Sequence, residues 1–347
     1  MQIKRESLLN CFMVLLPGLA KKEIVEQTTS FIFHKQRIFT YNDQVVISYP
    51  LPGLDFEGAV PAEKLYAFLS RLKKEFVKLS VIENTLQIKA GKSKAGFPFV
   101  ISISPSILLA IKKINTTDKK WKCIDKPEEF INALTTCAIS ASQNMNASQL
   151  TGVFCTPNNL QACDNFRLMD YRLSTSLPLI QTILIPAGSI QGFKSYNPNQ
   201  IATDNKGWLH FKNKKGVVYS IRLLAEANKF PILSLKKILS EPTQAKAKLP
   251  TKLLGVLQRA LLFGEDASVV FCENTMQIES KGESGWYRES IPIAVKGKIC
   301  KFNLSIKALL EAPKDVNMVE FTSSSIRFNG KRFTYCCAIQ AIKQEKK

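Results

Sequence analysis

Three segments of this chain share one pattern, in which an apolar run and a polar turn precede a second, alternating run. They are Phe31 to Asp43, Gly152 to Asp164 and Val269 to Glu279. A later alternating run recurs as well, at Asn84 to Lys89, Lys206 to Phe211 and Ser324 to Phe328. The copies lie about 120 residues apart, roughly one domain length and too long for a solenoid repeat. The pattern therefore predicts one small domain used three times.

Polar linkers at 115–120 and 240–246 separate the copies, so we expect domains at 1–120, 121–240 and 241–347. Amphipathic helices are expected at 127–140 and 249–263, and a second helix in each domain at 61–74, 186–193 and 303–310. The remaining segments alternate with period two, which is typical of half-buried antiparallel strands. The fold class is therefore α+β, with two helices packed on sheets in each domain.

The chain is strongly basic, with a net charge of +20 over 347 residues. The three predicted domains contain 18 Lys and Arg against 10 Asp and Glu, 13 against 7, and 17 against 11. A basic excess in every domain favours a long polyanionic partner that touches each of them. A generally lysine-rich proteome is the alternative explanation.

The nine cysteines are scattered, odd in number and without a Cys-x-x-Cys pair, so they predict neither a zinc site nor a disulfide framework. Reduced cysteines in apolar runs are typical of a cytoplasmic protein. Since no apolar stretch reaches 18 residues, we expect no membrane span.

The sequence predicts no active site and no cofactor. Gly91-Lys-Ser93 lacks the first glycine of a phosphate-binding loop. The two histidines, His34 and His210, have no Asp or Ser partner suggested by spacing. Neither clustered carboxylates nor metal-ligand spacings occur.

Cations are expected on the polar faces of the helices. Lys64, Arg71 and Lys74 fall together in the helix predicted at 61–74, and Lys252 and Arg259 are seven residues apart in the helix at 249–263. If all six helices face one way, they build one long basic surface.

These residues resemble one family, the bacterial sliding clamp, which is the beta subunit of DNA polymerase III. Gly152-Val-Phe followed by Ala162-Cys-Asp-Asn-Phe-Arg-Leu168 is similar to the family's Gly-x-x-Phe and Ala-Thr-Asp-Gly-His-Arg-Leu. Further similar segments follow the family's order across the chain: Thr40 to Asp43, Gly58 to Ala62, and Ser220 to Leu224 leading to Lys229-Phe-Pro231.

The resemblance implies three tandem clamp domains, and two chains that close head to tail into a homodimeric ring. Helices would line the hole and antiparallel sheets would form the outer wall. Double-stranded DNA would be held without sequence readout, because Lys and Arg meet phosphates and not bases. The protein would be a non-catalytic processivity factor that binds DNA polymerase and the clamp loader through short peptides.

The resemblance also implies a partner-peptide pocket between the second and third domains. The residues carried over are Leu150, Cys163, Asn165, Phe166, Arg167, Leu168, Pro231, Leu235, Lys236, Ile326, Ala338, Ile339 and Gln340. The C-terminal wall departs from the family's Met-Pro-Met-Arg-Leu ending, and Asn165-Phe166 replaces Gly-His. The peptide preference of the pocket is therefore not implied.

For DNA, Lys21 and Lys22 fall near the family's basic loop after the first helix. Lys64, Arg71, Lys74, Lys194, Lys252 and Arg259 are expected from helix faces alone, and a solvated surface charge is the alternative for each. Two other functions remain open. One is a clamp-derived regulator that binds polymerase or clamp loader without encircling DNA, and the other is a basic nucleic-acid enzyme.

Overall fold

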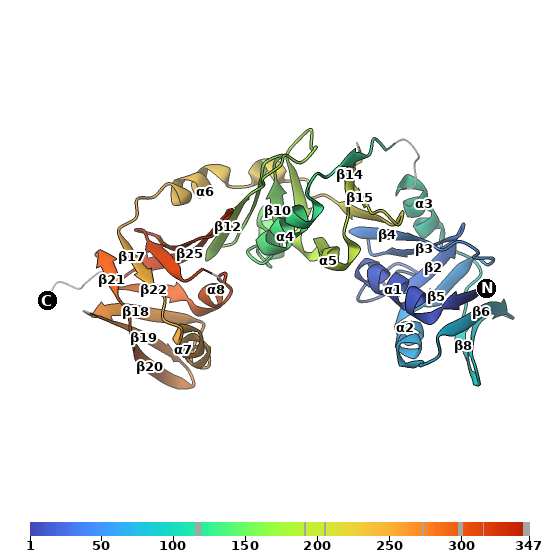
Figure 1. Cartoon of the computed structure of the whole chain (residues 1–347), viewed down its shortest axis with the longest axis horizontal. Helices are drawn as coiled ribbons and strands as arrows, with labels where there is room; N and C mark the ends of the chain where they lie inside the picture. Colours follow the sequence, from blue (N-terminus) through green and yellow to red (C-terminus); the bar gives the residue numbers. More distant parts are fainter. Residues whose placement is uncertain are drawn as a thin grey trace. The chain divides into compact units, whose positions relative to one another are not determined.

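The computed structural model describes residues 1–114, 119–190, 192–204, 206–272, 274–297, 301–314 and 316–342 (Figure 1). It contains two compact units, and each is described by itself. The first consists of Met1–Asn132 and Gly188–Ala225, and the second of Ala133–Ala187 and Glu226–Lys347. The three domain boundaries expected from the sequence remain a prediction.

The first unit contains two sheets and the helices packed on them. Its elements are β1 (Gln2–Lys4), α1 (Arg5–Leu15), η1 (Leu16–Gly18), β2 (Ser30–His34), β3 (Arg37–Tyr41), β4 (Val45–Pro50), β5 (Gly58–Pro61), α2 (Ala62–Arg71), β6 (Phe76–Ile82), β7 (Thr85–Ala90), β8 (Ser93–Pro98), α3 (Pro105–Ile114), β9 (Lys122–Cys123), α5 (Phe193–Tyr196), β14 (Gln200–Thr203), β15 (Trp208–Lys212) and β16 (Val218–Arg222). The strand orders are β1-β6-β7-β8 and β5-β2-β3-β4-β16-β15-β14-β9. Two elements cross the boundary between units in the sequence, α4 (Pro127–Ala138) and η3 (Ala187–Ile190).

The second unit is built around one large antiparallel sheet. Its elements are η2 (Met145–Leu150), β10 (Gly152–Cys155), β11 (Asn159–Cys163), β12 (Arg167–Arg172), β13 (Ile183–Pro186), η4 (Ala227–Lys229), α6 (Ile232–Leu239), β17 (Ala245–Lys248), α7 (Leu253–Ala260), β18 (Asp266–Cys272), β19 (Thr275–Gly282), β20 (Gly285–Pro292), β21 (Val295–Gly297), β22 (Phe302–Ser305), α8 (Ile306–Leu310), β23 (Met318–Phe321), β24 (Ser325–Asn329) and β25 (Phe333–Ala341). The main strand order is β13-β10-β11-β12-β25-β22-β18-β19-β20, with β17, β21, β23 and β24 beside it.

One strand topology occurs three times. A strand and a helix precede a three-stranded meander, and a further strand and helix precede a second meander. The first strand of the first meander pairs with the strand before the second helix, as β2·β5, β10·β13 and β18·β22. The strand before the first helix pairs with the second meander, as β1·β6, β9·β14 and β17·β23. The repeat read from the sequence is therefore confirmed in strand pairing.

The last strands of meanders from neighbouring repeats also pair with each other, edge to edge. β4 pairs with β16 in the first unit, and β12 pairs with β25 in the second. β8 ends the second meander of the first repeat, and β20 ends the first meander of the third repeat. Within the described residues, each of them pairs on one side only. Each junction between repeats thus pairs the last strand of a first meander with the last strand of a second meander. One strand of each type, β20 and β8, remains without such a partner within the described residues.

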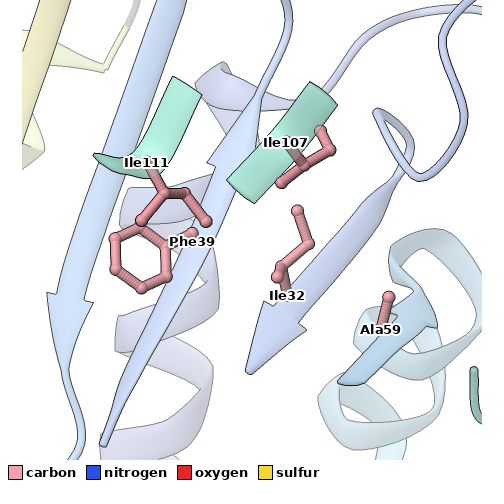
Figure 2. Close-up of a cluster of buried hydrophobic side chains, with 5 residues drawn as sticks. All are labelled: Ile32, Phe39, Ala59, Ile107 and Ile111. Atoms are coloured by element: carbon pink, nitrogen blue, oxygen red, sulfur yellow. The ribbon is translucent and has the colours of Figure 1, made fainter. Parts of the chain in front are cut away.

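The sheet that contains β2 to β5 is buried on both faces. Phe31 stacks on Phe12 of α1, with ring centroids 4.1 Å apart. On the other face, Ile107 and Ile111 of α3 are directed toward Ile32 and Phe39 (Figure 2). Burying each such side chain contributes about 1.5–3 kcal/mol. The expectation of half-buried strands is wrong here, because α3 covers the face that the alternating pattern assigned to solvent.

Several helices differ in extent from the sequence prediction. The chain leaves the helical conformation at Leu72, so α2 ends at Arg71 and not at 74. The helix expected at 303–310 begins at Ile306, because residues 302–305 form β22 and Ser305 caps the helix by accepting from the Ala308 N–H at 3.4 Å. Of the helix expected at 186–193, Ala187–Ile190 form η3 and Phe193 begins the four-residue α5, while α7 covers only Leu253–Ala260.

Candidate functional site

A cavity of about 480 Å³ lies in the second unit, between α6 and the junction of β12 with β25. Its lining consists of Cys163, Asp164, Asn165, Phe166, Arg167, Leu168, Ser234, Leu235, Lys237, Ile238, Glu241, Ser324, Ser325, Cys336, Ala338 and Ile339. Eight of the thirteen residues predicted for the peptide pocket are brought together here: Cys163, Asn165, Phe166, Arg167, Leu168, Leu235, Ala338 and Ile339.

The turn between β11 and β12 presents Phe166 at the rim of this cavity. The carboxylate of Asp164 accepts the backbone N–H groups of Phe166 and Arg167 at 2.8 and 2.9 Å. Ala338 on β25 donates its N–H to the Phe166 carbonyl at 2.7 Å. Phe166 is 52% exposed, so a fixed backbone presents an apolar side chain to solvent.

Arg167 is committed to the protein and does not project as a free cation. Its Nε donates to Asp164 Oδ2 at 3.0 Å, and its other end pairs with Glu311. Only 9% of the side chain is exposed. This guanidinium therefore fixes the pocket wall by joining the β11–β12 turn to the end of α8.

Residues at the end of α6 form the opposite wall. The Phe230 ring stacks on Phe154 at 4.6 Å and anchors the start of the helix. At its far end, Arg327 of β24 donates to the carbonyls of Ile238 and Glu241, both at 3.1 Å. Both ends of α6 are therefore tied to the sheet, which makes the cavity a preformed feature.

The floor of the cavity is apolar, and its cysteine thiols are unreactive. Burial raises the pKa of the Cys163 thiol to about 12 and that of Cys336 to about 11. Both thiols are therefore protonated at neutral pH and act as small apolar groups. Together with Leu168, Leu235 and Ile339 they suit apolar side chains of a short peptide.

Five predicted pocket residues lie outside the lining: Leu150, Pro231, Lys236, Ile326 and Gln340. Leu150 ends η2 and Pro231 precedes α6. Of α6 and the residues after it, Ser234, Leu235, Lys237, Ile238 and Glu241 line the cavity, and Lys236 does not. Gln340 pairs with Asn303 of β22, and Ile326 alternates with the lining residue Ser325. The helical period could have identified Ser234 and Ile238.

The predicted DNA-contacting cations occupy separate places. Lys21 and Lys22 are exposed in the loop before β2, and Lys64 and Arg71 are exposed on α2. Lys74 lies beyond the end of α2 and packs against Gly91, so its assignment to that helix face is wrong. Lys252 directly precedes α7. Lys194 belongs to α5, and its side chain is outside the described part of the chain.

Arg259 on α7 is already paired. It donates to Glu289 at 2.6 Å and to the Tyr287 hydroxyl at 2.9 Å. Hydrogen bonds from Tyr287 and Arg259 lower the pKa of Glu289 below its ordinary value. This exposed cluster binds Arg259 to β20 instead of leaving it free for phosphate.

The continuous basic helix surface expected from the sequence is wrong for the first helices of two repeats. The exposed residues of α1 are Glu6, Ser7, Asn10 and Met13, and those of α4 are Glu128 and Asn132. Exposed lysines or arginines do occur on α2, α3, α6, α7 and α8, so positive charge is present on some helices and missing from the exposed faces of α1 and α4.

A buried Ser-His-Asp series lies in the first unit, contrary to the expectation that His210 has no such partners. His210 Nδ1 lies 2.8 Å from Ser220 Oγ, and Nε2 lies 3.3 Å from Asp204 Oδ2. Strand register explains the contact, since His210 and Ser220 are paired on β15 and β16. Both side chains are fully buried, so no substrate reaches them. Burial, and to a smaller extent the positive charge of Lys119, lowers the pKa of His210 to about 4.

Other site types find little support in the described residues. No group of three or more His, Cys, Asp or Glu side chains there is placed to hold a metal ion. None of the described helices combines the length and apolar character needed to cross a bilayer. A second cavity of about 850 Å³ in the first unit is lined by none of the predicted site residues.

Comparison with known proteins finds no match by sequence but clear matches by structure. No family model matches the chain, and no curated protein matches it by sequence. Solved structures do match. A DNA polymerase III beta subunit from Thermotoga maritima has 15% identity and a TM-score of 0.79, with 99% of each chain covered.

Two further matches agree. A DNA polymerase sliding clamp from Bacillus subtilis has 18% identity and a TM-score of 0.74, and a Pseudomonas aeruginosa sliding clamp bound to griselimycin has 13% and 0.77; each comparison covers 99% of both chains. This protein therefore has the fold of the DNA polymerase III beta subunits, the sliding clamps, over essentially its whole length.

Proposed function

We propose that this protein is a DNA sliding clamp, a non-catalytic processivity factor that tethers a DNA polymerase to duplex DNA in the cytoplasm. The observation that carries the proposal is the full-length likeness to sliding clamps, with 99% of both chains covered at a TM-score of 0.79. The likeness includes all three repeats and is not limited to one domain.

A homodimeric ring is supported by the unused strand edges. β4·β16 and β12·β25 join repeats within the chain, while β8 and β20 keep one free edge each. Pairing β20 of one copy with β8 of another would repeat that junction head to tail, and the likeness to sliding clamps favours closure of the ring after two chains. Two exposed apolar side chains lie on or near β20: Trp286 of β20 is 63% exposed, and Leu262, in the turn after α7, is 75% exposed.

DNA would be held by phosphate contacts alone. Lys64 and Arg71 on α2, Lys252 before α7, and the loop lysines Lys21 and Lys22 are exposed cations that suit such contacts. Side chains of this kind do not distinguish base pairs, which permits sliding. The apolar cavity beside Phe166 would take a short peptide from the polymerase or the clamp loader.

Topological retention on DNA tests this function. The protein is incubated with a nicked circular plasmid or with the same plasmid cut once, and is then separated by gel filtration at moderate salt. A clamp co-elutes with the circle and is lost from the linear form, and electron micrographs show two-chain rings. Equal retention on both DNAs, together with the absence of rings, would exclude encirclement.

One observation favours the second candidate, a regulator that binds polymerase without encircling DNA. The exposed faces of α1 and α4 contain Glu6 and Glu128 but no lysine or arginine that is exposed in the described residues. This weakens the attraction for DNA that a clamp requires. A regulator would bind polymerase through the Phe166 cavity, remain monomeric in sedimentation, and show no preference for circular DNA.

A further inference from the structure

Three lysines form a row across the sheet of the first repeat. In the strand register, Lys78 of β6 lies opposite Lys89 of β7, and Lys89 lies opposite Lys94 of β8. All three are exposed. Neighbouring strands are about 4.8 Å apart, so three like charges are aligned at short and regular spacing. Like charges directly opposite one another destabilise a sheet, which means that folding alone does not favour this row.

The row lies on the solvent face of the sheet, opposite the helices. Val77, Leu79 and Ile88 alternate with the lysines and are buried on the other face. That face is covered by α2, where Phe68 contacts Phe97 of β8 at 5.7 Å between ring centroids. The lysine row is therefore separate from the cations of α2 that the proposed clamp would use.

No acidic side chain among the described residues is paired with the row. Within the described part of the chain, none of the three lysines forms an ion pair, and the nearby Glu75 is paired with Lys4 at 3.7 Å. Lys92, in the turn between β7 and β8, adds a further exposed cation. The related sheet of the third repeat provides a contrast. There Lys246, Glu320 and Arg327 are aligned across β17, β23 and β24, with Lys246 and Glu320 2.7 Å apart.

An exposed aromatic ring lies on the same face. Phe76 begins β6, two residues before Lys78, and is 44% exposed. Lys4 of β1 lies over its ring, with Nζ 6.0 Å from the centroid. A cationic track beside an exposed ring is the combination that binds single-stranded nucleic acid, in which phosphates meet lysines and a base stacks on the ring.

We infer that this face of β6, β7 and β8 binds the phosphate backbone of a single-stranded nucleic acid, with Lys78, Lys89 and Lys94 as the phosphate contacts and Phe76 as the stacking surface. Lysine suits this role because it is a point charge on a flexible stem and reaches phosphates of varying spacing. An acidic peptide is the other polyanion to consider, but it would make no use of the exposed ring. The inference does not depend on ring formation, since the side chains project from the sheet face and strand pairing uses its edge.

The test uses a labelled 20-nucleotide oligothymidylate, too short and linear to be retained topologically. Its affinity for the full-length protein is measured by fluorescence anisotropy over a range of salt concentrations. The triple variant Lys78→Gln, Lys89→Gln, Lys94→Gln is compared with a control that loses the same charge elsewhere, Lys296→Gln, Lys301→Gln, Lys314→Gln; the control lysines are exposed residues of the third repeat.

The row variant should reduce the slope of log affinity against log salt by about 2, since each contact to a single strand contributes about 0.7. If the two proteins bind equally at 1 M salt, the variant should bind about 100-fold more weakly than the wild type at 0.1 M salt. Phe76→Leu should weaken binding at least about fivefold with an unchanged slope. Thermal melting checks that each variant is folded.

Equal slopes for the row variant and the control would overturn the inference. Binding of polyglutamate to the wild type, with no binding of the oligonucleotide, would assign the face to an acidic protein instead. The plasmid assay tests the proposed function separately. If the protein is a clamp, the row variant should still be retained on circular DNA, whether or not it has lost affinity for the oligonucleotide.

Discussion

Arg167 of β12 and Glu311, the residue after α8, form an ion pair in which only 9% of the arginine side chain is exposed. Arg167 also binds Asp164, so one guanidinium joins the turn that presents Phe166 to the last repeat. The pocket wall is therefore held by a contact between residues far apart in the sequence.

Replacing Arg167 by Met should lower the free energy of unfolding by about 3 kcal/mol, because the change leaves carboxylates without their buried partner. Urea denaturation measures the effect. Arg172→Met is the matched control on the same strand. Arg172 is 82% exposed and lies 3.9 Å from Asp170, so its loss should cost less than about 1 kcal/mol. Equal effects of the two changes would contradict a structural role for the Arg167 pair.

Phe166→Ala should weaken polymerase binding about 10- to 30-fold, the effect of losing an apolar anchor in a peptide pocket. Stability should change by less than about 0.5 kcal/mol, since the ring is half exposed. Surface plasmon resonance with the cognate polymerase measures the first effect. Ile180→Ala removes an apolar side chain that lies outside the cavity and is 84% exposed, and it should bind as the wild type does. Wild-type affinity of the Phe166 variant would place the partner site elsewhere.

His210 makes stability depend on pH. Its folded-state pKa is lowered to about 4, mainly by burial, whereas an unfolded histidine titrates near 6.5. Between these values the unfolded chain binds the additional proton. The contribution of His210 is therefore complete above pH 6.5 and is lost as the pH falls toward 4, by up to about 3 kcal/mol.

Urea unfolding from pH 7.5 to 4 should show this loss in the wild type and in His34→Gln, which changes the only other histidine. In His210→Gln the pH dependence within this window should be smaller, although the variant is less stable throughout. Parallel curves for all three proteins would show that His210 does not titrate on unfolding.

Lys89→Glu should stabilise the fold by about 0.5–1 kcal/mol, because it turns two repulsive cross-strand pairs, with Lys78 and Lys94, into attractive ones. Thermal melting at low salt detects the gain, and 1 M salt should remove most of it through screening. Lys73→Glu, in the exposed loop before β6, controls for the change in net charge. A melting temperature no higher than that of this control would mean that the row is not repulsive.

The repeat was predictable because each hairpin has its own local signal, an apolar run before a turn and an alternating strand. The connecting helices α3 and α6 were not predicted, since they follow the last strand of a repeat and resemble linkers. Ile107 and Ile111 are spaced one helical turn apart, but only the sheet contact with Ile32 shows that they form a core.

The residues of the candidate pocket show the same difference between local signals and contacts of distant segments. The residues from Cys163 to Leu168 are contiguous and could be found from the resemblance. By contrast, Ser324, Ser325 and Cys336 reach the cavity through pairing of β24 with β25, a relationship between distant segments that one sequence does not display. The Ser220 contact of His210 was missed for the same reason.

The proposed ring places Leu262 in a contact between copies. Phe263 stacks on Tyr287 with ring centroids 5.9 Å apart, so the turn after α7 is fixed beside β20, and Leu262 is 75% exposed there. Leu262→Arg should shift the dimer to monomer by placing a charge in an apolar interface, with little effect on the fold. Sedimentation velocity measures the assembly state, and retention on circular plasmid should fall with it. Leu233→Arg provides the control, because Leu233 on α6 is 82% exposed and distant in sequence from β8 and β20. If Leu262→Arg remains dimeric, the two chains do not join through β20, and the free edge has another use.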